Sequence, residues 1–312
     1  MHNLTRRRFL AITAVALAGI PAATAAQHLH HWRGVALGAD ASITLTHPDA
    51  PRIVAIARHE IARLERIFSL HTPGSAIERL NATGRLKAPA PELLECLSHC
   101  ARLYRATGGL FDPSIQALWT VYARHFAGTG RADLPDADIR AAALAMVGFD
   151  RLQLDPAEIR IEHGTALSLN GIAQGYIADK VTALLHAQGL GNVLVNTGEF
   201  RALGHAPDGK PWQIGLRAGR DVLSRRAALQ DAALASSSAQ GISFDRHGRA
   251  GHILNPKTGL PAPAYWSLVS VTAPQAWLAD GLSTAFCLMD RHAIAQTLRL
   301  FPEARIERLV PV

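Results

Sequence analysis

The chain has 312 residues, of which 48% are hydrophobic and 18% charged, and its formal net charge is +7. This composition excludes a disordered, collagen-like or coiled-coil chain, and three cysteines without a CxxC pair provide neither a disulfide framework nor a structural zinc site. Three of the positive charges are consecutive near the N-terminus, so the remaining excess is too small and too scattered to favour nucleic-acid binding.

The first 26 residues form a predicted export signal. Three arginines at residues 6–8 precede an apolar run over residues 9–20, and mostly small residues follow. This order is typical of a signal peptide, and the apolar run is too short to span a bilayer. An arginine pair followed by x-Phe-Leu indicates a twin-arginine signal, which exports folded proteins. We therefore expect residues 1–26 to be the signal and residues 27–312 to be one domain that works in the periplasm, with retention at the inner membrane left open.

Hydrophobic spacing predicts helices and strands in an irregular order after the signal. Asp49 followed by Pro51 offers a helix N-terminus, and glycines are expected to end later helices at Gly108 and Gly189. Because strands and helices do not alternate regularly, we expect an α+β fold. We expect no membrane-spanning helix, because after residue 20 no apolar run reaches about 18 residues. The predicted elements are a strand over residues 42–46, helices over 50–68, 91–107 and 172–188, strands over 192–195 and 267–272, and a helix over 274–289.

Two glycine-containing segments carry polar residues that a segment packed only in the hydrophobic core would not need. Residues 108–113 read GGLFDP and predict a sharp turn with Asp112 at its exit, or simply a helix C-cap followed by an Asp-Pro turn. Residues 169–176 read LNGIAQGY and predict a strand that passes through a glycine turn into a helix. The N–H groups at such a helix start suit a phosphate, and close strand–helix packing is the alternative explanation of the glycines.

Two further segments contain candidate catalytic groups. His252 is predicted on a strand, and a histidine with a pKa of about 6.5 can accept a proton at neutral pH. A core or surface histidine is the alternative. Asp280 and Thr284 are four residues apart on a predicted helix and therefore share one face. A carboxylate and a hydroxyl together suit Mg²⁺, which completes its shell with phosphates and water. Capping of Asp280 by Thr284 or by the backbone is the alternative.

Several familiar motifs are absent, and the segments that are present resemble one family. The chain has no GxGxxG after a strand, no Walker A, no HExxH and no GxSxG, which weighs against Rossmann, P-loop, zincin and α/β-hydrolase enzymes. In order along the chain, six segments resemble motifs of the ApbE family, the FAD:protein FMN transferases: 68–81 (FS…S.I..LN), 108–113 (GGAFDP), 169–176 (LGGIAKGY), 195–198 (VNxGG), 252–259 (HIIDPRTG) and 279–285 (ADALATA).

The resemblance implies a large mixed α/β domain of the T-fold-like type and a Mg²⁺-dependent enzyme that uses FAD as substrate. Such an enzyme attaches FMN through a phosphodiester to a Ser or Thr of a flavoprotein, here a periplasmic or membrane-bound one, and releases AMP. By position, Asp280, Thr284 and the Gly171 carbonyl are implied metal ligands, and His252 is the implied base for the acceptor hydroxyl. The residues implied to line the FAD site are Leu37, Phe111, Asp112, Ser168, Gln174 and Ile253.

Four positions depart from these motifs. Ser168 stands where the family usually has Asp, Asn170 where it has Gly, Gln174 where it has Lys, and Glu199 where it has the second Gly of VNxGG. Ser168 and Gln174 together remove an acid and a base, so the change leaves no orphan charge. We therefore expect an active FMN transferase. Two alternatives stay open, namely a Mg²⁺-dependent FAD pyrophosphatase that transfers to water and a non-catalytic FAD-binding protein.

Overall fold

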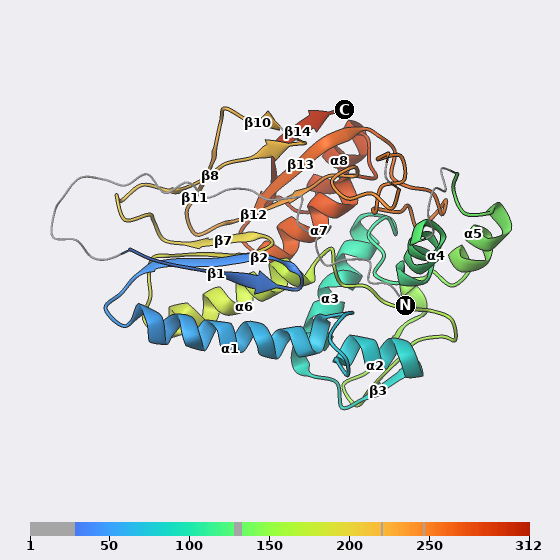
Figure 1. Cartoon of the computed structure of the whole chain (residues 1–312), viewed down its shortest axis with the longest axis horizontal. Coiled ribbons are helices and arrows are strands. Elements are labelled where there is room, and N and C mark those ends of the chain that lie inside the picture. The colour runs from blue at the N-terminus through green and yellow to red at the C-terminus, as the bar shows by residue number, and fades with distance from the viewer. Residues whose placement is uncertain (1–28, 128–132, 220, 246) are drawn as a thin grey trace.

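A seven-stranded antiparallel sheet forms the centre of the protein (Figure 1). The computed structural model describes residues 29–127, 133–219, 221–245 and 247–312, so the predicted export signal lies outside the described residues. The strands of this sheet, in spatial order, are β1 (Leu29–Ala36), β2 (Ala39–Thr46), β6 (Val193–Thr197), β7 (Phe200–Leu203), β12 (Ala233–Ser237), β13 (Trp266–Ala273) and β14 (Arg305–Pro311).

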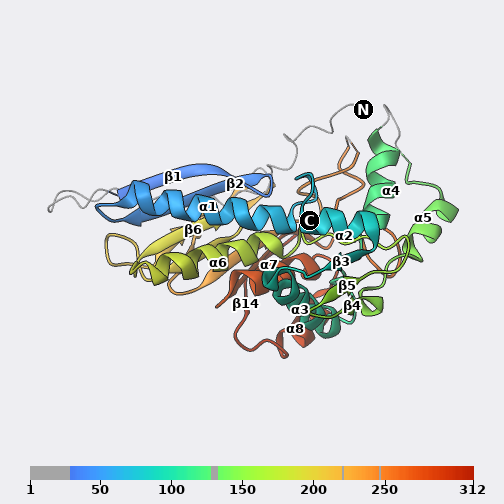
Figure 2. The ribbon, with the colours of Figure 1, turned by 90° about the horizontal axis from the view of Figure 1, so that it is seen from below.

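Among the described residues, three helices cover one face of this sheet, and a two-stranded antiparallel sheet covers the other. In chain order the α-helices are α1 (Ala50–Phe68), α2 (Ala76–Thr83), α3 (Pro91–Ala106), α4 (Gln116–Ala127), α5 (Ala137–Leu144), α6 (Ala173–Ala187), α7 (Ala276–Phe286) and α8 (Arg291–Leu298). Helices α1 and α6 lie side by side (Figure 2), below the sheet in the view of Figure 1. Helix α6 lies against β6 and β7, and α7 lies against β12 and β13. On the opposite face, β8 (Trp212–Ile214) and β11 (Ala227–Leu229) pack on apolar side chains of the central strands. Strands β6 and β12 are consequently buried at every position.

Short elements complete the fold away from the central sheet. Helices α4 and α5 pack together at one end of the molecule, on the right of Figure 1. There the buried Tyr122 hydroxyl donates to the carbonyl of Gly259 (2.7 Å) and so holds the loop of residues 251–259. The remaining elements are β3 (Arg85–Lys87), the 3₁₀-helix η2 (Phe149–Arg151), β4 (Gln153–Leu154), β5 (Glu158–Arg160), β9 (Arg217–Ala218) and β10 (Asp221–Val222).

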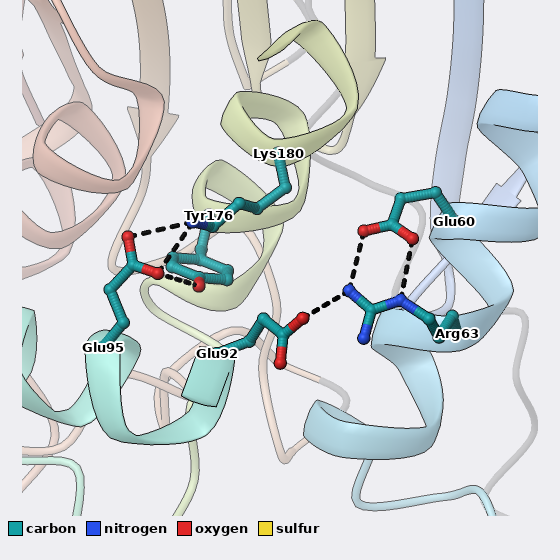
Figure 3. Close-up of polar contacts among 6 residues, drawn as sticks. All are labelled: Glu60, Arg63, Glu92, Glu95, Tyr176 and Lys180. Atoms are coloured by element: carbon teal, nitrogen blue, oxygen red, sulfur yellow. Dashed lines mark hydrogen bonds and ion pairs between the residues drawn. The ribbon is translucent and has the colours of Figure 1, made fainter. Parts of the chain in front are cut away.

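Two ion-pair networks join the helices that cover the sheet (Figure 3). Arg63 of α1 bonds Glu92 at the start of α3. One turn further along α3, Glu95 accepts from the Tyr176 hydroxyl (2.7 Å) and from the Lys180 ammonium (2.7 Å), both on α6. These contacts fix α3 against α1 and α6.

The predicted α+β class and the four predicted helices are confirmed, with three local corrections. The last of these helices ends at Phe286 rather than at residue 289. No strand leads into residue 169, where Ala166 makes only an isolated bridge to Ile115. Asp49 precedes α1, but its side chain makes no capping hydrogen bond. Within the described ranges, no helix is both long and apolar enough to cross a bilayer.

Candidate active site

Two turns and the end of a further strand lie at one end of the central sheet. Antiparallel pairing places Ala41 opposite Thr197, so the β1–β2 turn lies at the same end as the turn between β6 and β7. Strand β12 also ends there, at Ser237, because it runs antiparallel to β7. Leu37 occupies the β1–β2 turn with a left-handed φ of 46°, and its N–H donates to Glu65 (2.7 Å). The structure thus brings segments that are far apart in sequence to one end of the sheet.

The first turns of α6 and α7 cross at very close range beside this end of the sheet. A Cβ atom on Gly175 would lie 2.3 Å from the carbonyl oxygen of Ala276, so only glycine allows the two backbones to approach in this way. Asp179, one turn further along α6, accepts the N–H groups of Ala276 (2.9 Å) and Trp277 (3.0 Å). Its carboxylate therefore caps α7 from another element. This junction determines where Asp280, one turn into α7, is presented.

Two contacts at this junction involve the implied metal ligands. The Asp280 side chain is buried, and its Oδ2 accepts the N–H of Gly175 (3.0 Å). Thr284 lies against Gly171, since a Cβ there would be 3.2 Å from the threonine Oγ1. The Ser237 hydroxyl, at the end of β12, is 3.5 Å from the same Oγ1. Carboxylate, hydroxyl and carbonyl oxygens are the donors that Mg²⁺ takes.

Two buried carboxyl groups lie here without a basic partner in the described part of the chain. Burial raises the pKa of Asp280 to about 7, and the charge of Asp179 acts in the same direction. Burial and the charge of Asp280 raise the pKa of Glu199 well above its ordinary value. Among the described residues, no basic side chain pairs with Asp280 or Glu199, and Arg201 pairs with Asp179 instead (3.3 Å). Buried carboxylates without a basic partner are costly, so this donor set fits a bound cation.

His252 lies in a loop and not on the predicted strand. Gly251 and Leu254, on either side of it, form isolated β-bridges, whereas His252 lies in a bend of the chain between them. The ring Nδ1 lies 3.0 Å from the carbonyl oxygen of Ile242. A carbonyl only accepts, so in the neutral ring the proton sits on Nδ1 and Nε2 is the acceptor. Burial lowers the pKa of His252, which keeps this ring neutral at pH 7.

The loop that carries His252 is tied to the region of the carboxylates. Gly251 packs against the carbonyl oxygen of Ala239, which follows Ser237 by two residues. The same loop reaches the GGLFDP segment, where a Cβ on Gly108 would be 3.9 Å from the Lys257 ammonium. The loop therefore connects the end of β12 with the turn that follows α3.

Phe111 and Asp112 are held firmly within that turn. Phe111 is buried in the main core. The Asp112 carboxylate accepts from the backbone N–H of Ser114 (2.8 Å) and from that of Phe149 (3.3 Å), and it also bonds the Ser114 hydroxyl. Burial raises the pKa of Asp112 despite these hydrogen bonds. The structure thus gives Asp112 a role in holding the turn.

The other implied FAD-site residues take different positions around the site. Ser168 donates its N–H to the carbonyl of Pro113 (2.7 Å), which places it beside the GGLFDP turn. Gln174 lies over Gly198, because a Cβ at that glycine would fall 2.7 Å from its amide. The Ile253 side chain is buried in the main core. Ser168 therefore lies by the GGLFDP turn, Gln174 lies by the β6–β7 turn, and Ile253 is part of the core.

Two features of the α6 start were not predictable from the motif. Of its early N–H groups, that of Ala173 bonds the carbonyl of Leu169 (2.8 Å) and that of Gly175 bonds Asp280, so both are already satisfied. Asp179, which caps α7, was missed because its partners lie about 97 residues further along the chain. A lone Asp inside a predicted helix carries no local signal for such a role.

Known proteins resemble this chain in sequence and in fold. The chain is 30% identical over 264 residues to the FAD:protein FMN transferase of Treponema pallidum, covering 76% of this chain and 71% of that one. The Haemophilus influenzae FAD:protein FMN transferase is 29% identical over 266 residues, covering 80% and 75%. The apo crystal structure of the Pseudomonas stutzeri flavinyl transferase ApbE matches with a TM-score of 0.78 and 26% identity, over 88% of this chain and 89% of that one. Because residues 37–306 also match the family model, the chain belongs to the ApbE family.

Proposed function

We infer that this protein is an enzyme that transfers FMN from FAD to another protein. The inference is supported by family membership and by the relatives, which are named FAD:protein FMN transferases. One structural observation supports it most, namely that the start of α6 contacts α7 at both Asp280 and Thr284, through Gly175 and Gly171. In detail, we propose that FMN is joined through a phosphodiester to a Ser or Thr hydroxyl of a flavoprotein and that AMP leaves.

His252 is the proposed general base for the acceptor hydroxyl. Its Nδ1–H is oriented by the Ile242 carbonyl, and its Nε2 is the atom that would take the proton. The lowered pKa keeps the ring unprotonated at neutral pH, as a base requires. General-base help of this kind contributes roughly 10²–10⁴-fold to a rate.

Asp280, Thr284 and the Gly171 carbonyl are the residues proposed to hold Mg²⁺. Bound there, the cation would offset the negative charge of the FAD pyrophosphate and of the departing AMP. The chain's own contribution is to place a buried carboxylate and a hydroxyl on one face of α7 and to hold α7 rigidly through Asp179.

The test is a transfer assay read by mass spectrometry. The purified protein is incubated with FAD, Mg²⁺ and a domain that carries an acceptor threonine. The expected result is an FMN-sized mass gain on the acceptor and released AMP, both abolished by EDTA and by Asp280→Ala. His252→Ala should slow transfer and leave FAD binding intact. Free FMN and AMP without any adduct would instead identify a pyrophosphatase, and intact bound FAD a binding protein.

We also propose export to the periplasm by the twin-arginine route. The proposal is supported by the sequence of residues 6–20 alone. Replacing Arg6 and Arg7 by lysine should leave the protein in the cytoplasmic fraction, whereas a protein that still reaches the periplasm contradicts this route. The acceptor would then be a flavoprotein in, or facing, the periplasm.

A further inference from the structure

Glu199 occupies the turn between β6 and β7, at the end of the sheet where β12 also ends. Its Oε2 accepts the backbone N–H of Ser236 (3.1 Å) near the end of β12. The next residue, Ser237, contacts the hydroxyl of Ser283 (2.7 Å) and that of Thr284 (3.5 Å) on α7. Glu199 is therefore anchored to the strand whose end touches the Thr284 side of the site.

The start of α6 borders Glu199 from the other side. Gln174 packs over Gly198, the residue before Glu199, and the Thr197 hydroxyl donates to the Gln174 carbonyl (2.7 Å). The next residue of α6, Gly175, donates its N–H to Asp280 (3.0 Å). The strand and the helix that border Glu199 thus also contact Thr284 and Asp280. The interaction between the Asp280 charge and the Glu199 carboxyl agrees with this proximity.

The Glu199 carboxylate is only partly satisfied. The residue is 8% exposed, and its Oε1 has no hydrogen-bond or ion-pair partner among the described residues. Within the same residues, no group of three or more His, Cys, Asp or Glu side chains lies close enough together to hold a metal ion. A cation bound here would therefore contact at most two carboxylates. A buried carboxyl is costly to ionise without a positive partner, and a cation bound beside Asp280 would supply one.

We propose that Glu199 supplies a second carboxylate to the cation site of Asp280 and Thr284 and so sets how tightly this protein holds a divalent cation. The inference rests on the proposed function, because it concerns the same site. It assigns control of cation affinity to a position at which the chain departs from the glycine of the VNxGG motif. A second nearby negative charge strengthens cation binding whether it contacts the ion directly or through water.

The experiment measures Mn²⁺ binding to the full chain without FAD, by the loss of the free-Mn²⁺ electron paramagnetic resonance signal. Mn²⁺ takes the same hard oxygen ligands as Mg²⁺. Glu199→Gln keeps an oxygen that can accept the Ser236 N–H and removes only the charge. We expect it to weaken Mn²⁺ binding about 10- to 100-fold, the size seen when groups around a metal site are changed. Asp208→Asn, an exposed carboxylate elsewhere, is the matched control and should leave the affinity unchanged.

Two further variants separate the possible failures. Asp280→Asn should abolish Mn²⁺ binding, and normal binding by that variant would overturn the proposed metal site itself. If Asp280→Asn loses binding while Glu199→Gln binds like the wild type, only the role of Glu199 is refuted. Glu199→Gly restores the motif residue and serves as the readout if the glutamine variant does not fold. A wild-type chain that takes up no Mn²⁺ also refutes the proposal.

Discussion

Replacing Gly175 by alanine tests whether the close crossing of α6 and α7 positions Asp280. The new Cβ would lie 2.3 Å from the carbonyl oxygen of Ala276 and 2.8 Å from the backbone nitrogen of Trp277. Ordinary van der Waals contact of a Cβ atom begins at 3.4 Å, so α7 must move by roughly 1 Å. Both opposing atoms are backbone, and neither can swing away as a side chain would. The substitution therefore displaces the helix that carries Asp280.

The expected magnitude combines two opposing effects. Overpacking costs about 1–3 kcal/mol, and alanine recovers up to about 1 kcal/mol because it forms helices better than glycine. The net loss of about 1–2 kcal/mol should lower the Tm by about 2–6 °C. The Gly175–Asp280 hydrogen bond, now 3.0 Å, would also be lost. Misplacement of a functional group by 1 Å can lower a rate about 10²-fold, so we expect FMN transfer to be about 10²-fold slower.

Scanning calorimetry and the mass-spectrometric transfer assay measure the two effects separately. Gly191→Ala is the matched control, because a Cβ at Gly191 meets nothing within 4 Å and its φ is not left-handed. The control should unfold and react like the wild type. If Gly175→Ala also shows an unchanged Tm and an unchanged transfer rate, the crossing does not position Asp280 and the reasoning is wrong.

Three further substitutions test other contacts. Burial raises the pKa of Asp245, but hydrogen bonds from Ala250 and its neighbours lower it to about 2 overall, so its stabilisation is present above about pH 4 and is lost as the pH falls through 2. Asp245→Asn should therefore cost about 2 kcal/mol in urea unfolding at pH 7 and flatten the stability profile between pH 4 and 2, and an unchanged profile would contradict this. Asp179→Ala removes the cap of α7 and leaves Arg201 unpaired, which should cost roughly 2–4 kcal/mol, whereas a loss below 0.5 kcal/mol in the same assay argues against a capping role. Tyr122→Phe deletes one buried hydrogen bond and should cost about 1 kcal/mol with transfer nearly intact, so a large rate loss would assign this residue a larger part in holding the His252 loop.

The sequence alone determined those parts of the protein that depend on neighbours along the chain. The helix over residues 50–68 followed from apolar spacing, and the common face of Asp280 and Thr284 followed from their separation of four residues. The motifs that resemble the ApbE family could be recognised because their residues are contiguous, and the family is confirmed over residues 37–306. Such features need only the local geometry of a helix or turn.

The tertiary structure decided the features that depend on contacts between distant segments. The strands β6 and β12 are buried on both faces, so their side chains do not alternate in polarity, and the partner of each strand could not be read from its own residues. Asp179 caps a helix about 97 residues further along the chain, and Glu199 approaches Asp280 only because β7 and β12 are neighbours. Periodicity reports which face of an element is apolar. It does not report which other element that face meets, because long-range pairing is set by the packing of the whole sheet.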